Sequence, residues 1–448
     1  MKKLKKVFVN VICFCVLTAA MGITSFAGEV EEEQNLMVGA AVRDITPTED
    51  MFPMPAVAGL EVAGVVDSLH TRIIAIGDGE ETALIVSNET GKGPYGPTFT
   101  AALSEHTGIP VENIFYTATH AHAVPEIVEE IDLDFDEDDP EVTSLQKWGK
   151  LCMGQILEAA DEALNSMQPA TVGVGYSDCY VNVNRSAEYV HEDGTSYYAQ
   201  GVNWERPSDK TLAVIRFCDL EGNPIAFIVN YAVHGIVMYY NQLIDGQMGV
   251  SADLPGFVST QIETKYEGSV ALWLSGAAGD QNPIVTTGYF APTLESGDFM
   301  PGLLGNSEAV LDYMGRMQFA DVLTAIRSIE EQNGTAAISS ANGSTAIPGV
   351  EEEEFELHLS VLRIGDIALV GSPGELFNSI GIGLKENSLL QDTIIVNHVW
   401  TQEGQYNGYI PDDFGLETKG FNVPEIYQQG YVDDALVTLM NQLIEETD

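Results

Sequence analysis

The sequence has 448 residues, of which 45% are hydrophobic and 19% are charged, so it fits one large or two medium globular domains and excludes disorder, collagen and coiled coil as descriptions of the whole chain. Asp and Glu outnumber Lys and Arg by 67 to 19, which gives a formal net charge of −48. A chain this acidic repels phosphate backbones, and we therefore expect no nucleic-acid partner.

The first 27 residues have the features of a secretory signal peptide. Four lysines lie within the first six residues, an apolar run covers 7–23, and Ser25-Phe26-Ala27 is a small-x-small cleavage site. An uncleaved membrane anchor is the alternative, but Asn10 interrupts the apolar run, which is short for a spanning helix. We expect cleavage before Gly28, a secreted or cell-envelope location, and no stable membrane span afterwards.

An acidic linker over 28–37 leads to a domain over 38–448, in which predicted strands alternate with amphipathic helices. Hydrophobic runs predict strands at 71–77, 82–88, 114–119, 212–217, 225–230, 270–275, 357–364, 367–371 and 394–400, the first two joined around Asp78-Gly79. Helical periodicity is clearest at 144–167, 307–330, 376–385 and 433–446. This alternation is typical of an α/β fold with a mixed sheet flanked by helices. No segment of roughly 20 to 50 residues repeats, which argues against solenoids and propellers.

Several other segments are better explained by a structural role than by a catalytic or metal-binding one. The acidic run from Glu126 to Glu141 lacks the ordered spacing of a calcium loop, so we expect a solvated loop, with a lid over a site as the alternative. A second acidic block covers 351–354, and the stretch 332–350, rich in small and polar residues, predicts a surface loop or hairpin. Cys152, Cys179 and Cys218 form neither a disulfide framework nor a CxxC site, and we expect buried free thiols, with one disulfide as the alternative.

The strongest chemical signal is Thr119-His120-Ala121-His122, which follows the strand predicted at 114–119. Side chains two positions apart on a strand project to the same side, so His120 and His122 can reach one point beyond the sheet edge. Neutral imidazole is the commonest protein ligand for zinc. The pair therefore indicates a metal or catalytic site, with two structural histidines as the alternative.

Other polar residues follow later in the chain. His234 comes just after an apolar strand, and Asp280 and Asn282 lie in a small-residue turn where they could orient a ligand or an oxyanion. Glu375 follows Pro-Gly, and Tyr409 ends a Tyr-Asn-Gly-Tyr segment. Each residue taken singly is more typical of a turn, a helix start or a packed aromatic, and the hypothesis of a site depends on the whole set.

Read in chain order, these segments resemble the neutral, non-lysosomal ceramidase family of zinc amidases. The catalytic domain of that family carries T-H-x-H at a strand end, an N-R-S turn, a V-H-G turn, a G-D-x-S-P-N turn, P-G-E and Y-x-G-Y. The corresponding segments are THAH at 119–122, NRS at 184–186, AVHG at 232–235, GDQNP at 279–283, PGE at 373–375 and YNGY at 406–409. The resemblance covers about 38–430, and it implies an α/β fold with the site at strand ends.

The resemblance also implies roles for individual residues. The zinc ligands would be His120, His234, Glu375 and Tyr409, and His122 and Arg185 would contact the scissile group or the product carboxylate. Nitrogen and oxygen donors of this kind suit zinc. We also expect Asp253 or Asp280 to hydrogen-bond to a ligand imidazole.

The chain departs from the family in two ways. Asn282 occupies the place of the serine that is central to catalysis in the ceramidases, and an amide side chain cannot act as a nucleophile. We also expect no C-terminal β-sandwich of the ceramidase kind. Attack by a zinc-bound water would make the serine unnecessary, with His122 as general base or acid and Arg185 or Asn282 stabilising the oxyanion.

The sequence therefore predicts a secreted zinc-dependent hydrolase that cleaves the amide C–N bond of an N-acylated small molecule or lipid. An ester, lactone or other acyl substrate is one alternative. A catalytically silent extracellular binding protein of the same fold is another, and Asn282 is the residue that favours it.

Overall fold

The computed structural model describes residues 35–92, 96–126, 133–136, 139–285, 288–289, 300–301, 306–330, 333–350, 354–400 and 406–448. The predicted signal peptide and residues 28–34 of the linker lie outside these ranges, as do parts of both acidic runs. Those assignments stay predictions. Among the described residues, no helix combines the length and the apolar character needed to cross a membrane.

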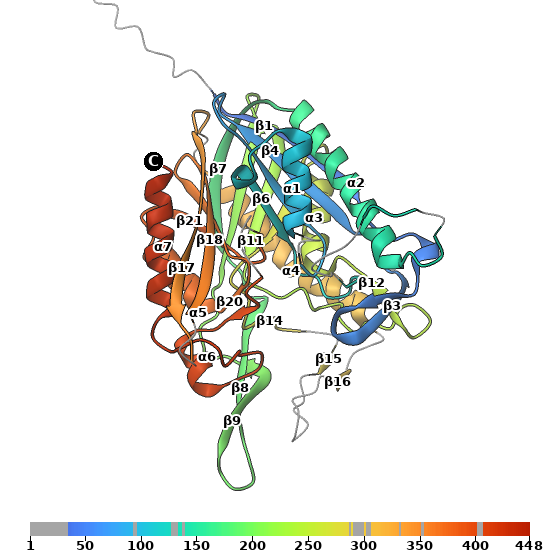
Figure 1. Ribbon diagram of the computed structural model, residues 1–448, viewed down its shortest axis with the longest axis vertical. Coiled ribbons are helices and arrows are strands. Elements are labelled where there is room, and N and C mark those ends of the chain that lie inside the picture. Colours follow the sequence, from blue (N-terminus) through green and yellow to red (C-terminus); the bar gives the residue numbers. More distant parts are fainter. Residues whose placement is uncertain are drawn as a thin grey trace, which may run out of the picture. The chain divides into compact units, whose positions relative to one another are not determined.

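Three successive units with the same order of elements make up most of the described chain (Figure 1). Each unit has three antiparallel strands, a helix, a fourth strand parallel to the third, and a second helix. The first unit consists of β1 (Met37–Asp44), β4 (His70–Gly77), β5 (Thr82–Asn88), α1 (Gly96–Thr107), β6 (Ile114–Ala118) and α2 (Ser144–Asn165). The second consists of β7 (Gln168–Asp178), β10 (Thr211–Asp219), β11 (Pro224–Tyr231), α3 (Asp253–Lys265), β13 (Val270–Ser275) and α4 (Ser307–Ser328). The third consists of β17 (Ile338–Pro348), β18 (Glu354–Ile364), β19 (Ile367–Gly371), α5 (Asn378–Glu386), β21 (Asp392–Val396) and α7 (Val432–Glu446).

Short pairing between β1 and β7 joins the first two units into an eight-stranded mixed sheet, and the third unit forms a separate four-stranded sheet. Shorter elements lie in the connections. They are β2 (Met54–Ala56), β3 (Leu60–Val65), β8 (Asn182–Val190), β9 (Ser196–Asn203), β12 (Met248–Val250), β14 (Gln281–Pro283), β15 (Gly288–Tyr289), β16 (Met300–Pro301), β20 (Glu375–Leu376), β22 (Tyr409–Ile410) and α6 (Asp413–Thr418), with single turns of 3-10 helix at Glu49–Met51, Val57–Gly59 and Val111–Asn113. The predicted α/β fold with a mixed sheet flanked by helices is confirmed.

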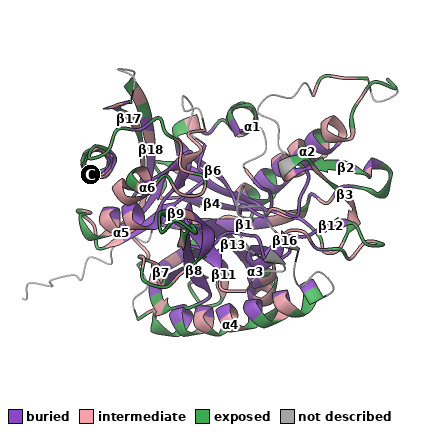
Figure 2. Cartoon of the chain, turned by 90° about the horizontal axis from the view of Figure 1, so that it is seen from below, coloured by how far each residue is buried: buried purple, intermediate pink, exposed green. Residues whose placement is uncertain are grey.

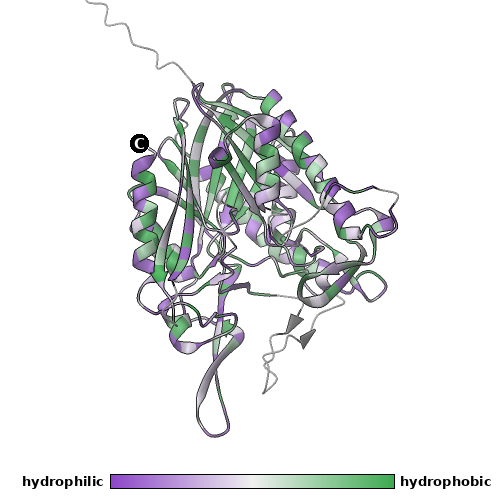
Figure 3. Cartoon of the chain, in the orientation of Figure 1, coloured by the Kyte–Doolittle hydropathy of each residue, from purple (hydrophilic) through white to green (hydrophobic). Residues whose placement is uncertain are grey.

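All three units contribute to one shared hydrophobic core. Alternate residues of their strands, such as Ile74, Ile228 and Leu369, are fully buried in this common cluster. The residues that point the other way pack against the helices of their own unit, α2 on β1 and β4, α4 on β7 and β10, and α7 on β17 and β18. Figure 2 shows the buried strands at the centre with the helices around them, and Figure 3 shows the same strands as the most hydrophobic part.

Local chemistry explains where several elements begin and turn. Helix α2 begins with a capping box, in which Thr143 accepts from the Gln146 backbone N–H and the Gln146 side chain accepts from the Thr143 backbone. The hairpin predicted around Asp78-Gly79 is confirmed, with Asp78 Oδ1 accepting from two backbone N–H groups and Gly79 at φ 93°. The last helix, α7, places its apolar stripe on β17 and β18.

The ends of the fourth strands of the three units are bonded to one another. Thr117 Oγ1 donates to the Asn397 carbonyl, the Asn397 backbone N–H donates to the Ser275 carbonyl, and Ser275 Oγ donates to the Thr119 carbonyl. These bonds bring together the residues that follow β6, β13 and β21. The three units therefore send their connecting loops to one place.

The predicted strands and helices are found, with a few corrections. The stretch 332–350 contains the long strand β17, which forms a hairpin with β18, so the hairpin alternative was the right one. The strand predicted to reach Trp400 ends at Val396, and Glu375 lies in β20, before α5 begins at Asn378. Cys152, Cys179 and Cys218 are free and buried, as expected.

Candidate metal centre

Loops from all three units place the candidate ligands. His120 and His122 follow β6, His234 follows β11, and Glu375 follows β19. The loops pack tightly, since a Cβ on Gly235 would lie 2.7 Å from the His120 carbonyl oxygen. His120 itself has φ 62°, a left-handed conformation that is uncommon for residues other than glycine.

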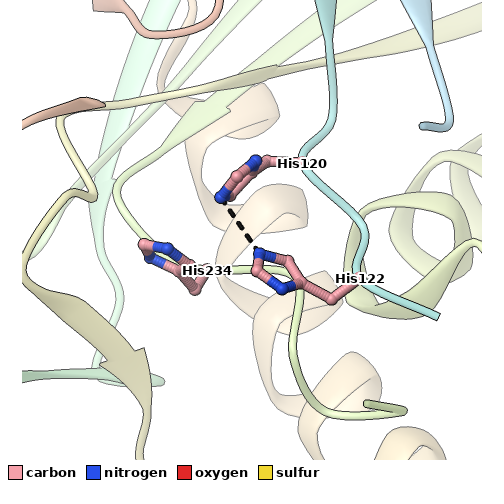
Figure 4. Close-up of side chains that lie close together, drawn as sticks. All are labelled: His120, His122 and His234. Carbon is pink, nitrogen blue, oxygen red and sulfur yellow. Dashed lines mark hydrogen bonds between the residues drawn. The ribbon is translucent and has the colours of Figure 1, made fainter. Parts of the chain in front are cut away.

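The three imidazoles and the Glu375 carboxylate converge on one point. Ring nitrogens of His120, His122 and His234 lie within 4.8 Å of one another, and Figure 4 shows the three rings turned toward a common centre. Glu375 Oε2 lies 3.4 Å from His120 Nε2 and 3.3 Å from His234 Nε2. His122 Nε2 lies 3.0 Å from His120 Nε2. The structure thus brings together three of the four predicted metal ligands and the predicted catalytic histidine.

Backbone carbonyls orient the two most buried histidines. His120 Nδ1 donates to the Gly91 carbonyl at 2.6 Å, and His234 Nδ1 donates to the Ala278 carbonyl at 2.7 Å. Because each proton is on Nδ1, both Nε2 atoms present a lone pair to the centre, where that of His120 accepts from His122 Nε2. Among the described residues, His234 Nε2 and Glu375 Oε2 have no hydrogen-bond partner although they are buried. Buried nitrogen and oxygen atoms whose lone pairs have no hydrogen-bond partner are suited to coordinate a divalent metal ion.

The expectation that Asp253 or Asp280 bonds to a ligand imidazole was wrong. Asp253 accepts from the backbone N–H groups of Val237, Met238 and Leu254. Asp280 accepts from the side chains of Asn184 and Gln281 and from the backbone N–H of Asn378. Both carboxylates therefore hold loops in place, and backbone carbonyls take the role that was assigned to them.

The electrostatics of the cluster favour neutral imidazoles at His122 and His234 and an ionised Glu375. Burial lowers the pKa of His122 well below its usual value, and the neighbouring His120 and His234 lower it further. Burial, and then Arg185, lower the pKa of His234 to about 4. Burial alone would raise the pKa of Glu375, but His120 and His234 hold it well below the usual range. Neutral imidazole and carboxylate are the forms that bind metal ions.

Tyr409 lies next to Glu375, because the two residues are direct partners in the parallel pair β20–β22. Burial, and then the charge of Glu375, raise the pKa of Tyr409 to about 12, so its hydroxyl is protonated in the metal-free protein. The guanidinium of Arg185 lies 5.3 Å from the centre of the Tyr409 ring, and Arg185 Nη2 donates to the Gly279 carbonyl. Tyr409 and Arg185 are therefore in the neighbourhood that the sequence predicted for them.

Asn282 lies on the short strand β14, which pairs with β8. Its partner is Val183, and the register places Asn282 on the same face of the pair as Arg185. The side chain is buried, and within the described part of the chain neither its oxygen nor its nitrogen has a hydrogen-bond partner. Its amide is thus a buried polar group whose hydrogen-bonding capacity is unused among the described residues.

Comparison with known proteins identifies the fold. No protein-family model matches the chain, and no curated protein matches its sequence. The crystal structure of neutral ceramidase from Pseudomonas aeruginosa matches with a TM-score of 0.68 and 15% sequence identity, over 92% of this chain and 74% of that one. A structure described as ceramidase complexed with C2 matches with a TM-score of 0.68 and 13% identity, over 92% of this chain and 76% of that one. The chain has the neutral ceramidase fold. The resemblance expected from the sequence is confirmed at the level of the fold.

Sequence reasoning missed one histidine at the centre of this ceramidase fold. His398 follows β21, the strand equivalent to β6 in the third unit, and its ring stacks on that of His120 with centroids 4.0 Å apart. His398 Nδ1 donates to the Tyr406 hydroxyl at 2.9 Å, and that hydroxyl donates to Glu375 Oε1 at 3.3 Å. Like His120, His398 has a left-handed backbone, with φ 63°. Its signal was its place just beyond a strand, which the overlong strand prediction concealed.

A cavity of about 520 Å³ opens onto the cluster. Its lining consists of Val57, Gly91, Lys92, His120, His122, Pro125, Glu126, Glu375, Tyr406, Asn407, Gly408 and Tyr409. The volume suits a small-molecule group. In this ceramidase fold the cavity therefore gives a ligand direct access to His122 and Glu375.

Proposed function

We propose that the protein is a secreted zinc-dependent hydrolase that cleaves the amide C–N bond of an N-acylated small molecule or lipid. The observation that carries this proposal is the convergence of His120 Nε2, His234 Nε2 and Glu375 Oε2 on one point. Two of these atoms, His234 Nε2 and Glu375 Oε2, are buried and have no hydrogen-bond partner among the described residues. The neutral ceramidase fold supports the same reaction class. The candidate metal site also lies in a cavity at strand ends, where α/β proteins commonly carry their catalytic residues.

In this proposal the ion is held by His120, His234, Glu375 and Tyr409. The fixed Nδ1–H bonds of the two histidines are what metal ligands normally have, since they set the tautomer and the ring orientation. Tyr409 joins through its pairing with Glu375. With a pKa of about 12 in the metal-free protein, the Tyr409 phenol would bind as phenolate only when a cation is present.

His122 is the proposed general base and acid. It lines the cavity, and it differs from the two ligand histidines because it is partly exposed and has no hydrogen-bond partner on Nδ1 within the described residues. Zinc, when bound, polarises an acyl carbonyl and makes a coordinated water more acidic. His122 takes a proton from the attacking water and returns it to the leaving nitrogen. The products are a carboxylic acid and an amine.

Arg185 and Asn282 are the proposed stabilisers of the negative charge that develops on the acyl oxygen. Both are buried, and they share one face of the β8–β14 pair. The Asn282 amide has a donor without a partner among the described residues, and such a donor adds to a fixed cation in an oxyanion site. Ester and lactone carbonyls would react in the same way, so they belong in the substrate panel.

A second candidate is a binding protein that keeps the fold and the metal but does not turn over substrate. Asn282 favours it, because an amide stands where the ceramidases carry their catalytic serine. The partner-free Asn282 side chain would then contact a bound ligand.

Metal analysis and a hydrolysis panel test the proposal together. Elemental analysis of the purified protein is expected to give about one zinc per chain, and a panel of N-acyl amides and the matching esters is expected to show cleavage that a chelator stops and added zinc restores. Zinc without turnover would favour the binding protein. Turnover that survives complete removal of metal would overturn the zinc mechanism.

A further inference from the structure

The first unit presents a cation where the other two units present candidate ligands. The loop after the third strand carries His234 in the second unit and Glu375 in the third. In the first unit the loop after β5 carries Gly91, whose carbonyl accepts from His120, and then Lys92. The topological equivalence of the three loops explains why Lys92 lines the same cavity as His120, His122 and Glu375.

Lys92 lies over an aromatic ring of the cavity lining. Its Nζ lies 4.5 Å from the centre of the Tyr406 ring, and within the described ranges no carboxylate lies within ion-pair distance of it. The Tyr406 hydroxyl donates to Glu375 Oε1, so a single aromatic ring separates the ammonium group from the candidate metal centre.

The chain has 67 acidic residues and only 19 lysines and arginines, so the surroundings of each cation can be compared with those of Lys92. Some buried or half-buried cations are paired, as Arg72 is with Glu263, Arg206 with Asp412 and Lys385 with Asp209. Others are not, since the half-buried Lys210 bonds only to neutral groups among the described residues. Near the candidate metal centre, Arg185 also has no carboxylate within ion-pair distance among the described residues, and it bonds to a carbonyl and faces two aromatic rings. Lys92 and Arg185 thus lie around one candidate centre, each without an ion pair within the described ranges.

The geometry points to a substrate that carries a carboxylate near its scissile amide, with Lys92 as the residue that binds this anion. This inference rests on the proposed function and names its substrate class, for which an N-acyl amino acid is the simplest example. The chain as a whole repels anions, so selection of an anionic substrate requires a local cation at the cavity. Lys92 supplies it as a mobile point charge, supported by the face of Tyr406.

Matched substrates and variants test the inference. N-decanoylglycine carries a carboxylate on the amine side, N-decylsuccinamic acid carries one on the acyl side, and N-decanoylethanolamine is neutral. The wild type is expected to prefer one of the two anionic amides over the neutral one by about tenfold to a hundredfold in kcat/KM, the range expected for a charge-assisted hydrogen bond. Lys92→Met is expected to lower kcat/KM for the preferred anionic amide at least tenfold more than for the neutral amide, and Lys92→Arg to restore part of the preference.

The control is Lys265→Met, which removes the same charge from a lysine that lies over the Tyr266 ring on α3 and does not line the cavity. It is expected to leave the preference intact. Calorimetry with N-decanoylglycine and N-decylsuccinamic acid on the chelator-treated protein separates this inference from the proposed function, since it needs no turnover. Binding at least tenfold weaker in Lys92→Met supports the inference even if no amide is cleaved. Equal binding, or equal kcat/KM for anionic and neutral amides in the wild type, would overturn it.

Discussion

Two clusters of buried charge in this protein are built in opposite ways. In one, Arg72 on β4 bonds to Glu89 and makes a bidentate pair with Glu263, at 2.7 and 3.1 Å. The remaining oxygen of Glu89 accepts from the His70 backbone N–H, so all four carboxylate oxygens have partners. In the histidine cluster, by contrast, Glu375 Oε2 and a ring nitrogen have none among the described residues.

The difference separates a structural cluster from a functional one. Buried charges that satisfy each other hold elements together, here β4, the segment after β5, and α3. Buried groups without partners cost about 1–3 kcal/mol each, so a fold keeps them only where something else is gained. At the histidine cluster the gain would be a bound metal ion. This distinction between a structural and a functional cluster leads to predictions that can test it.

The largest expected effect is at the metal centre itself. His120→Ala removes an oriented ligand and is expected to abolish zinc binding and activity. His122→Ala is expected to retain zinc and to lower kcat by about a hundredfold to ten-thousandfold, the usual contribution of a general base. Zinc content after dialysis and kcat of each variant are the measurements. Equal loss of zinc in both variants would show that His122 is a ligand and that the proposed division of roles is wrong.

The next effect concerns the free energy of unfolding, to which the arginine cluster is expected to contribute more than the histidine cluster. Arg72→Met leaves the buried Glu89 and the half-buried Glu263 without their cation and is expected to lower the free energy of unfolding by about 3–5 kcal/mol, as broken buried ion pairs do. Glu375→Gln is the matched change in the other cluster. In the metal-free protein it is expected to cost less than Arg72→Met does, because the new amide still offers an acceptor to Tyr406 and no unpaired charge is left behind. Urea unfolding with a chelator measures both. Equal losses would mean that both clusters are structural.

Asp253 is intermediate between the two clusters, since it has hydrogen bonds from three backbone N–H groups but no cation. Burial raises its pKa to about 7, and burial also raises the pKa of the nearby Asp67 to about 6. The unfolded value is about 3.9, so the folded protein binds these protons more tightly. Their contribution to stability is therefore fully present below about pH 4 and is lost as pH rises through 6 and 7.

Asp253→Asn isolates this effect, and Asn also tolerates the left-handed backbone at this position, φ 57°. Between pH 4.5 and 6.5 the wild type is expected to lose roughly 1 kcal/mol more per pH unit than the variant does. The measurement is urea unfolding of both proteins at several pH values. Parallel pH profiles would contradict the raised pKa.

The sequence could predict the strands, the main helices and most of the candidate site, because strand ends followed by histidine or glutamate are local patterns. It could not reveal the three equivalent units, since each spans far more residues than a short repeat and the shared feature is pairing order. The partners of His120 and His234 were also out of reach, because Gly91 and Ala278 contribute only backbone carbonyls whose positions depend on distant loops. Lys92 carries no motif at all, and only the topology places it at the cavity.

His398 gives the smallest of these effects and the sharpest test of how the cluster is supported. It is linked to the candidate ligands in two ways. Its ring stacks on that of His120, and its Nδ1 bonds to the Tyr406 hydroxyl, which in turn bonds to Glu375. His398→Asn keeps a residue that accepts φ 63° but removes the stacked ring, and it is expected to weaken zinc binding about tenfold, as loss of a supporting group does. Tyr406→Phe removes only the hydroxyl that links His398 to Glu375. Chelator competition measures the zinc affinity of each variant. The visible spectrum of the cobalt-substituted protein reports the geometry of the metal ligands. A change in folding stability alone would not alter that spectrum. If His398→Asn bound zinc normally with an unchanged cobalt spectrum, His398 would be a packing residue, and support of the centre would rest with the carbonyls of Gly91 and Ala278.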